Sequence, residues 1–405
     1  MTAAIHWFLP TSGDGRTVVG SSHAATTPGT AQAFRAPTLD YLTDVARTAD
    51  RLGYEAVLTP TGTWCEDAWL TTAALLRETQ RLHFLVAFRP GLVSPTLAAQ
   101  MAATLQRFSG GRVRLNVVTG GDESEQRRFG DWLEHDERYA RTAEFLAVVR
   151  GLFSGEPLDL DGQHYRIRDG RVPVPPDPAP PIYFGGSSEA ALPVAAEHAD
   201  VYLTWGEPPA QAKAKIDRVR ELAAERGRTL RFGIRLHTIS RDSSAEAWGV
   251  TEKFLDAWSP EQVAAAQAQF RSSSSTGQRR MAALNGDRFD GRSRSLEVHP
   301  GLWAGVGLVR GGAGTSLVGS HEEVADLVQE YHEAGFDEFV LSGYPHLEEA
   351  HWFAEGVRPI LDQRGVTRPV GARGAVGQGD QGSGGPAGAR PARDEAALRT
   401  HSVAF

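Results

Sequence analysis

Short apolar runs alternate with longer amphipathic stretches along most of this chain. The apolar runs have the length of β-strands and lie at residues 5–9, 55–58, 83–87, 112–118, 181–184, 201–204, 230–239 and 338–341. Between them, apolar residues recur at helical spacing in segments 39–52, 95–108, 137–153, 188–197, 209–226, 321–334 and 346–361. This alternation is typical of repeated β-α units.

Eight strands with intervening helices predict an α/β fold, a (β/α)8 TIM barrel, in a chain of 405 residues. A doubly wound open sheet is the alternative. In a barrel, the segments that follow the carboxyl ends of the strands form the active site. Here those segments are rich in Gly, Ser, Thr, Arg, His and Trp, which predicts that functional side chains converge on one face.

Arg235 and His237 stand two residues apart near the end of the seventh predicted strand. Residues with this spacing point to the same face of a strand. A guanidinium group beside an imidazole suits the binding of an oxyanion and the transfer of a proton. The alternative is an edge strand with one solvated face, and the convergence of the other loops disfavours it.

A phosphate site is predicted where the fifth strand runs into Gly185-Gly186-Ser187-Ser188. Glycines let the backbone approach a ligand closely, and we expect the two serines to open a helix whose amide groups point at the anion. A plain glycine turn followed by a serine helix cap is the alternative. His135 and Tyr139 lie one turn apart near the start of another helix and could reach the same ligand.

Other loops carry further candidate groups. Arg310, in a glycine-rich run, could close over an anion or be an ordinary solvated loop residue. Trp205 follows the sixth strand and could wall a substrate pocket or cap the core. Tyr344 and His346 follow the eighth strand and could donate protons. Cys65 precedes a helix, and we expect it to line a pocket rather than act as a nucleophile.

The composition is that of a globular protein with a large core, because 41% of the residues are hydrophobic and 23% are charged. The 42 basic and 50 acidic residues give a net charge of -8, which argues against nucleic acid or an anionic membrane as the main partner. One cysteine excludes an internal disulfide, and the 13 histidines show no metal-binding spacing at these positions. With no visible signal peptide or apolar run of about 20 residues, we expect a cytoplasmic protein.

Three segments depart from the β-α pattern. Residues 16–36 and 245–300 read as insertions in a barrel domain that spans residues 1–365. The second insertion holds two helical stretches and then a serine- and arginine-rich run, and long insertions of this kind commonly act as lids. Residues 366–405 are dominated by Gly, Ala, Arg and Pro, which predicts a disordered tail.

Long blocks of this sequence resemble the reduced-flavin-dependent alkanesulfonate monooxygenases, a branch of the bacterial-luciferase-like superfamily. The similarity runs from about residue 5 to residue 361 and is densest at residues 7–11, 60–62, 65–69, 118–120, 183–188, 203–209, 232–237, 302–315 and 342–350. The resemblance implies a TIM-barrel subunit, in dimers or tetramers, that receives FMNH2 from a separate NAD(P)H-dependent FMN reductase. It also implies a reaction in which O2 is used to cleave the C–S bond of an organosulfonate, giving an aldehyde and sulfite.

The resemblance and the loop positions together assign roles to individual residues, and no metal site is expected. The catalytic candidates are Arg235, His237, Arg310, on a mobile lid, and Tyr344. The substrate would contact Arg235, Arg310, Trp205, Cys65, His346 and Ser12. FMN would contact Asn116, Thr119, His135, Tyr139, Gly185, Gly186, Ser187 and Ser188.

Ser12 is a departure, since the family commonly has histidine at this position. Segment 16–36 is also longer and more polar than the family pattern, and the tail does not match it. Ser12 and segment 16–36 both fall at the presumed substrate mouth, so they leave the choice of substrate open. One alternative is a sister flavin monooxygenase that acts on a sulfone, a sugar sulfonate or another small molecule. The other is a non-catalytic flavin- or anion-binding protein.

Overall fold

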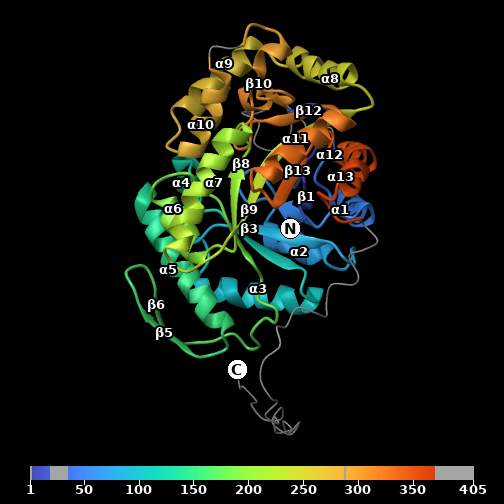
Figure 1. Cartoon of the computed structure of the whole chain (residues 1–405). Helices are drawn as coiled ribbons and strands as arrows, with labels where there is room; N and C mark the ends of the chain where they lie inside the picture. Colours follow the sequence, from blue (N-terminus) through green and yellow to red (C-terminus); the bar gives the residue numbers. More distant parts are fainter. Residues whose placement is uncertain (1, 19–34, 287–288, 370–405) are drawn as a thin grey trace. The chain divides into compact units, whose positions relative to one another are not determined.

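In the computed structural model, which describes residues 2–18, 35–286 and 289–369, eight parallel strands close into a barrel (Figure 1). Neighbouring strands pair in parallel, and β8 pairs with β9 to complete the ring. The predicted (β/α)8 TIM barrel is confirmed, and the alternative of an open sheet is wrong. The barrel strands are β1 (Ala4–Phe8), β2 (Ala56–Thr59), β3 (His83–Phe88), β4 (Val113–Val117), β7 (Ile182–Phe184), β8 (Val201–Trp205), β9 (Arg231–Arg241) and β13 (Glu338–Ser342).

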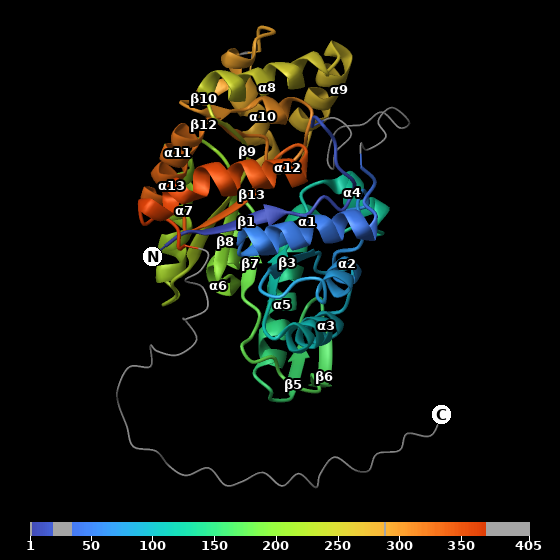
Figure 2. The same ribbon diagram turned by 90° about the vertical axis from the view of Figure 1, so that its right-hand side faces the viewer.

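Helices pack around the outside of the barrel (Figure 2). In α1 (Leu39–Leu52), Thr38 caps the first turn by accepting a hydrogen bond from the Tyr41 amide, and Gly53 ends the helix with a φ of 78°. The segment predicted as one helix at 346–361 is interrupted by a π-helical turn. The other outer helices are α2 (Ala68–Leu75), α3 (Pro95–Ser109), α4 (Glu123–Arg128), α5 (His135–Phe153), α6 (Ala191–His198), α7 (Pro209–Ala224), α11 (His321–Glu333), α12 (His346–Trp352) and α13 (Arg358–Gln363).

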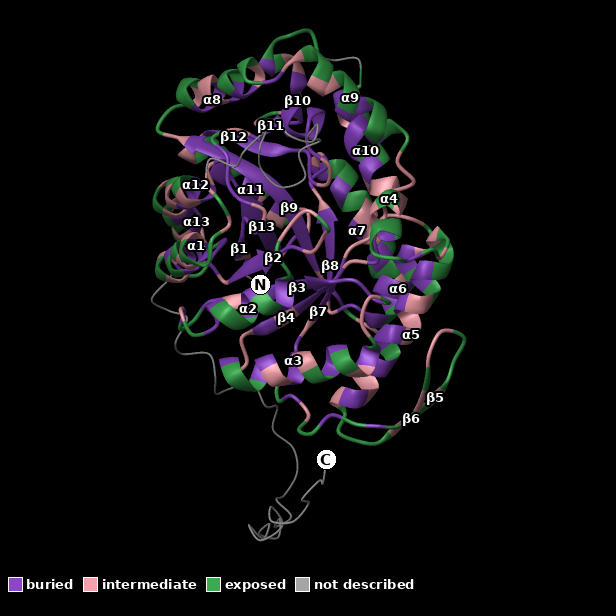
Figure 3. Cartoon of the chain, turned by 180° about the vertical axis from the view of Figure 1, so that it is seen from behind, coloured by how far each residue is buried: buried purple, intermediate pink, exposed green. Residues whose placement is uncertain are grey.

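Inward-facing side chains fill the barrel in layers, and its strands are almost wholly buried (Figure 3). Near the amino ends of the strands, the buried carboxylate of Glu338 accepts hydrogen bonds from His6 (2.9 Å) and from the Tyr183 hydroxyl. Although burial opposes ionisation, these bonds and the charge of Arg114 lower the pKa of Glu338 to about 2. An apolar layer follows, formed by Phe8, Leu58, Leu85, Val201, Leu203 and Val340.

The strand β9 is longer than its barrel neighbours and extends beyond the ring. Its second half pairs in parallel with β12 (Ser316–Ser320), which continues into the antiparallel strands β11 (Leu302–Trp303) and β10 (Glu297–His299). The sequence pattern did not predict these three strands. It also missed a separate hairpin, formed by β5 (Leu158–Asp161) and β6 (Arg166–Gly170).

The predicted insertion at 245–300 forms a cap of helices at one end of the barrel. Two of them, α8 (Ser244–Asp256) and α9 (Pro260–Arg271), correspond to the two predicted helical stretches. A third, α10 (Thr276–Asn285), lies inside the polar run for which no helix was predicted. Ser275 starts it by accepting a hydrogen bond from the Gln278 amide.

Most of the predicted insertion at 16–36, and nearly all of the predicted tail at 366–405, lie outside the described residues. Among the helices that the structure describes, none combines the length and the apolar character needed to cross a bilayer.

Candidate active site

Arg235 and His237 lie on the inward face of β9, as their spacing predicted, and both contact Ser342 of β13. The Arg235 Nη2 group donates to Ser342 Oγ (2.8 Å), and that hydroxyl donates to His237 Nδ1 (2.7 Å). The Nη1 group of Arg235 donates to the carbonyl oxygens of Leu236 (2.5 Å) and Val340 (3.3 Å). The sequence analysis missed Ser342, because its place opposite His237 follows from the register between β9 and β13.

His237 is held as a neutral imidazole in one tautomer. Its Nε2 atom lies 3.1 Å from the carbonyl oxygen of Ala313, which can only accept, so Nε2 carries the proton. Burial lowers the pKa of His237 well below its ordinary value, and the positive charges of Arg235 and Arg310 lower it further. Because both ring nitrogens are engaged, the geometry favours a positioning role for His237.

Arg310 reaches the same centre from the loop that follows the 3-10 turn η2 (Gly305–Leu308). Its Nη1 group donates to the carbonyl oxygens of Gly311 (2.9 Å) and Ala313 (3.2 Å). The residue is only 3% exposed, so the alternative of a solvated loop arginine is wrong. In the described part of the chain, neither Arg310 nor Arg235 forms an ion pair with a carboxylate. Burial and the charge of Arg310 lower the pKa of Arg235 to about 9.

Two buried guanidinium groups that have no counter-charge in the described part of the chain indicate an anion site, because an unpaired buried charge is costly. Unpartnered polar atoms also occur in the segments that follow β1, β9 and β13. The Tyr344 hydroxyl, Ser12 Oγ and Arg310 Nε are all buried, and none has a hydrogen-bond partner among the described residues. Buried polar atoms of this kind normally bind a ligand or ordered water. The Tyr344 ring stacks on His237, with ring centres 5.4 Å apart.

His346 forms a buried dyad with Asp14 that the sequence analysis did not foresee. The His346 Nδ1 atom donates to Asp14 Oδ1 (2.8 Å), and the His346 amide donates to Oδ2 (2.7 Å). Tyr41 and the Gly15 amide also donate to this carboxylate. Burial opposes the ionisation of Asp14, but His346 and Tyr41 outweigh it and lower its pKa. The dyad therefore fixes the His346 ring, which meets Tyr344 edge-on with centres 5.0 Å apart.

The inserted helix α10 covers this centre. A Cβ atom on Gly277 would lie 3.1 Å from the Trp205 ring, so α10 packs directly on the indole. Trp205 and Arg310 both approach Gly312, at 3.9 Å and 3.5 Å from the position that its Cβ would take. The Ser274 hydroxyl donates to the carbonyl oxygen of Gly121 (2.8 Å). This bond ties the insertion that follows β9 to the segment that follows β4.

The predicted phosphate turn lies between β7 and α6, but its serines do not open the helix. The helix begins at Ala191, three residues later than predicted, because Ser188 belongs to the preceding turn and accepts from the Ala191 amide. Gly186 is required here, since a Cβ atom would lie 2.6 Å from Ala191 and 3.2 Å from the Tyr139 hydroxyl. Within the described residues, the amide groups of Gly186, Ser187 and Ser188 donate to no protein acceptor. They could therefore bind an anion.

The other predicted cofactor residues lie on β4 and at the start of α5. Asn116 is buried near the end of β4. The Thr119 and Thr142 hydroxyls lie 3.2 Å apart, so Thr119 is tied to α5. The ring of His135 meets Tyr139 with centres 5.0 Å apart, as expected for one helical turn.

Cys65 is a half-buried free thiol in the loop after β2. Its sulfur lies 3.7 Å from the carbonyl oxygen of Gly62. Burial raises the pKa of Cys65 to about 12, so the thiol stays protonated, which disfavours a nucleophilic role.

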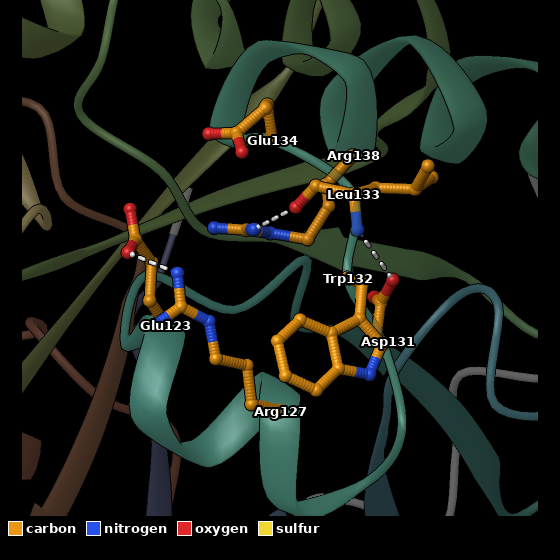
Figure 4. A pocket seen from close by; sticks show the side chains of 7 residues that line it. All are labelled: Glu123, Arg127, Asp131, Trp132, Leu133, Glu134 and Arg138. Carbon is orange, nitrogen blue, oxygen red and sulfur yellow. Dashed lines mark hydrogen bonds and ion pairs between the residues drawn. The ribbon is translucent and has the colours of Figure 1, made fainter.

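A small hollow between α4 and α5 lies apart from these groups (Figure 4). Its volume of about 10 Å³ is the space of a single water molecule, so it is no substrate site. Arg138 crosses it and donates to the Leu133 carbonyl oxygen (2.5 Å). The lining residues are Glu123, Arg127, Asp131, Trp132, Leu133, Glu134 and Arg138.

The chain belongs to the luciferase-like monooxygenases, because the model of that family matches residues 4–338. It accordingly has the fold of the luciferase-like flavin-dependent monooxygenases.

Solved structures support the same fold. A riboflavin lyase (RcaE), determined with modified FMN and riboflavin, is 22% identical with a TM-score of 0.73, covering 91% of this chain and 93% of that one. The long-chain alkane monooxygenase LadA is also 22% identical, with a TM-score of 0.72 and the same coverages. The EDTA monooxygenase EmoA from Chelativorans sp. BNC1 is 19% identical with a TM-score of 0.71, covering 91% and 96%.

Proposed function

We propose that the protein is a two-component monooxygenase that uses FMNH2 and O2 to cleave the C–S bond of an organosulfonate. In this reaction one oxygen atom of O2 becomes the oxygen of an aldehyde and the other leaves as water. Sulfur leaves with its three oxygens as sulfite, one proton is released, and FMNH2 is oxidised to FMN. A separate NAD(P)H-dependent reductase would supply FMNH2, and the subunit would act in a homodimer or homotetramer.

The observation that carries this proposal is the pair of buried guanidinium groups that have no carboxylate partner among the described residues. Arg235 and Arg310 are 5% and 3% exposed. A sulfonate spreads one negative charge over three oxygens, which suits two arginine side chains that offer N–H groups in fixed directions. Burial and the charge of Arg310 lower the pKa of Arg235 in the free protein. The negative charge of a bound sulfonate would offset both effects. A neutral substrate would leave both cations uncompensated.

The residues near β4, α5 and the turn after β7 fit a flavin mononucleotide. The free amides of Gly186, Ser187 and Ser188 suit its phosphate, and the Tyr139 hydroxyl lies beside them. When bound, reduced FMN supplies the two electrons that activate O2. The contribution of the chain is to position the reactants and exclude water, and α10 packed on Trp205 serves the second purpose.

Cleavage also requires that a proton leave the carbon next to sulfur. His237 is poorly suited to accept it, because its Nδ1 already accepts a hydrogen bond and its Nε2 donates one. In His346, by contrast, Nδ1 is bound to Asp14, and Nε2 forms no hydrogen bond within the described residues. We therefore assign proton transfer to His346, with Asp14 as its positioning residue and the unpartnered Tyr344 hydroxyl as a donor to the substrate oxygens.

The test is a coupled assay with FMN, a flavin reductase, NADH and O2, in which sulfite is measured for a panel of substrates. The panel should contain short and long alkanesulfonates, an aromatic sulfonate, a sugar sulfonate and a dialkyl sulfone. Sulfite from at least one sulfonate is the expected result. Oxidation of the sulfone alone, or sulfite from none of the compounds, would refute the proposal.

A further inference from the structure

Two buried glutamines of the insertion contact the loop that carries Arg310. Gln267 lies on α9 and Gln278 on α10, and each is only 8% exposed. Glutamine is seldom buried, because its amide group then loses hydrogen bonds to water. Both side chains therefore require partners inside the protein, and both find them in the backbone between Gly307 and Gly312.

Gln267 acts as a donor at the start of this loop. Its Nε2 group donates to the carbonyl oxygens of Gly307 (2.8 Å) and Leu308 (3.0 Å). These carbonyls belong to the last turn of η2, where backbone acceptors normally lack a partner within the helix. The Arg310 amide donates to the Val306 carbonyl oxygen of the same turn (3.1 Å). By capping η2, Gln267 fixes the backbone immediately before Arg310.

Gln278 acts as an acceptor further along the loop. Its Oε1 atom accepts a hydrogen bond from the Gly312 amide (2.8 Å). The carbonyl oxygen of the same peptide group, that of Gly311, accepts from Arg310 Nη1 (2.9 Å). One peptide group thus joins the insertion to the guanidinium, and hydrogen bonds in such a chain strengthen one another. Gln278 therefore constrains where the positive charge of Arg310 lies.

The loop needs this support because flexibility and charge both oppose its position. It is rich in glycine, which gives its backbone wide conformational freedom. The positive charges of Arg235 and Arg310 repel each other, which favours displacement of the loop from the barrel. His237 holds the loop on the barrel side through the Ala313 carbonyl oxygen, and the two glutamines hold it on the side of the insertion.

The loop requires opposite hydrogen-bonding roles of the two amides, which makes their contributions separable. A carboxylate at position 267 could not donate to two carbonyl oxygens. A carboxylate at position 278 would still accept from the Gly312 amide, but it would place a negative charge one peptide group away from the Arg310 guanidinium. That charge would act as an internal counter-ion and compete with a bound anion. The neutral amide of Gln278 avoids this competition.

We propose that Gln267 and Gln278 are positioning residues of the anion site. They hold the loop of Arg310, and the neutral acceptor at position 278 keeps the charge of Arg310 available to the substrate. The inference rests on the proposed function in that the bound anion is then the sulfonate. The insertion thus sets the affinity for the anion without supplying a charge of its own.

Hydrogen–deuterium exchange tests the positioning role without substrate or flavin. Exchange should be measured by mass spectrometry in peptides that cover residues 306–315, for the wild type, Gln267→Glu, Gln278→Met and Gln278→Glu. We expect about tenfold faster exchange of the loop amides in Gln267→Glu and Gln278→Met, the equivalent of one buried hydrogen bond. Gln278→Glu keeps the acceptor and should retain the protection of the wild type. Gln269→Glu is the matched control, because Gln269 lies exposed on α9.

Anion binding separates this role from a merely structural one. The affinity for hexanesulfonate should be measured by isothermal titration calorimetry at constant ionic strength for the same proteins. Gln278→Glu should weaken binding about tenfold although its loop stays protected, because the new carboxylate interacts with Arg310. Gln267→Glu should weaken binding through the displaced loop, and Gln269→Glu should bind as the wild type does. The affinity for FMN should be the same in all of them.

Unchanged exchange in both Gln267→Glu and Gln278→Met would overturn the proposal. So would the absence of hexanesulfonate binding by the wild type, or equal affinity in the wild type and Gln278→Glu. These measurements need no turnover, so the absence of sulfite in the coupled assay would refute the proposed function alone.

Discussion

The Nε2 atom of His237 donates a hydrogen bond to the carbonyl oxygen of Ala313, 3.1 Å away, and so joins a barrel strand to the loop of Arg310. Arg310 donates to the same carbonyl oxygen. The His237 imidazole therefore links strand β9, which carries Arg235, to the loop that carries Arg310.

His237→Ala should weaken substrate binding more than it alters proton transfer. With the link to Ala313 removed, the Arg310 loop loses one buried hydrogen bond, worth about tenfold in affinity. We expect the KM for the sulfonate to rise about tenfold while the pH dependence of kcat stays in place. Loss of one limb of the pH profile would show instead that His237 carries the proton.

Asp14→Asn should lower kcat. The His346 Nδ1 group donates to Asp14 Oδ1, and the substitution replaces this charged acceptor with a neutral amide, so the ring loses its fixed orientation. We expect kcat to fall about tenfold, which corresponds to one charged hydrogen bond. Tyr41→Phe keeps the carboxylate and serves as the matched control. An unchanged kcat in Asp14→Asn would contradict the role assigned to the dyad.

Arg310→Ala should abolish most turnover and spare the cofactor. The lost guanidinium contributes charged hydrogen bonds to a buried anion, so kcat/KM should fall about 100-fold. FMN affinity should stay within about threefold. Arg271→Ala, at the end of α9 and exposed, is the control within the same insertion. A fully active Arg310→Ala enzyme would exclude Arg310 from the anion site.

The buried histidines should contribute less to stability as the pH falls. Burial lowers the pKa of His6 and His237, and it lowers that of His83 to about 4. At these histidines the folded state disfavours protons that the unfolded chain binds below pH 6.5, so their contribution to the free energy of unfolding falls as the pH drops through that value. His83 alone should account for ~2 kcal/mol between pH 7 and pH 5. Urea unfolding at both pH values tests this, and His83→Gln should remove that share. The same pH-dependent change in stability in wild type and His83→Gln would be incompatible with it.

The barrel could be predicted because its strands and helices have clear local sequence patterns. The run that contains Arg235 alternates its inward and outward side chains, and helix α1 carries its own start and stop at Thr38 and Gly53. The shared inward orientation of Arg235 and His237 was predicted from the same alternation of side chains along a strand.

The parts that escaped prediction depend on partners that lie far away in the sequence. Asp14 and His346 are 332 positions apart, and only the closed ring brings them together. The strand β12 is defined by its pairing with β9. Helix α10 has a polar composition, and its place is set by contacts with Trp205 and Gly312 rather than by its own apolar pattern.

The long strand β9 performs two tasks on consecutive stretches of one backbone. Its first half pairs with β8 and β13 and carries Arg235, while its second half, from His237 onward, pairs with β12. The cap is thus grafted downstream of the anion site on a rigid stem. Helices α8 to α10 lie between β9 and the loop of Arg310, so exchanging them leaves in place the register that sets Arg235 against Ser342. Chimeras that exchange these helices and keep Arg310 offer a direct route to redirect specificity.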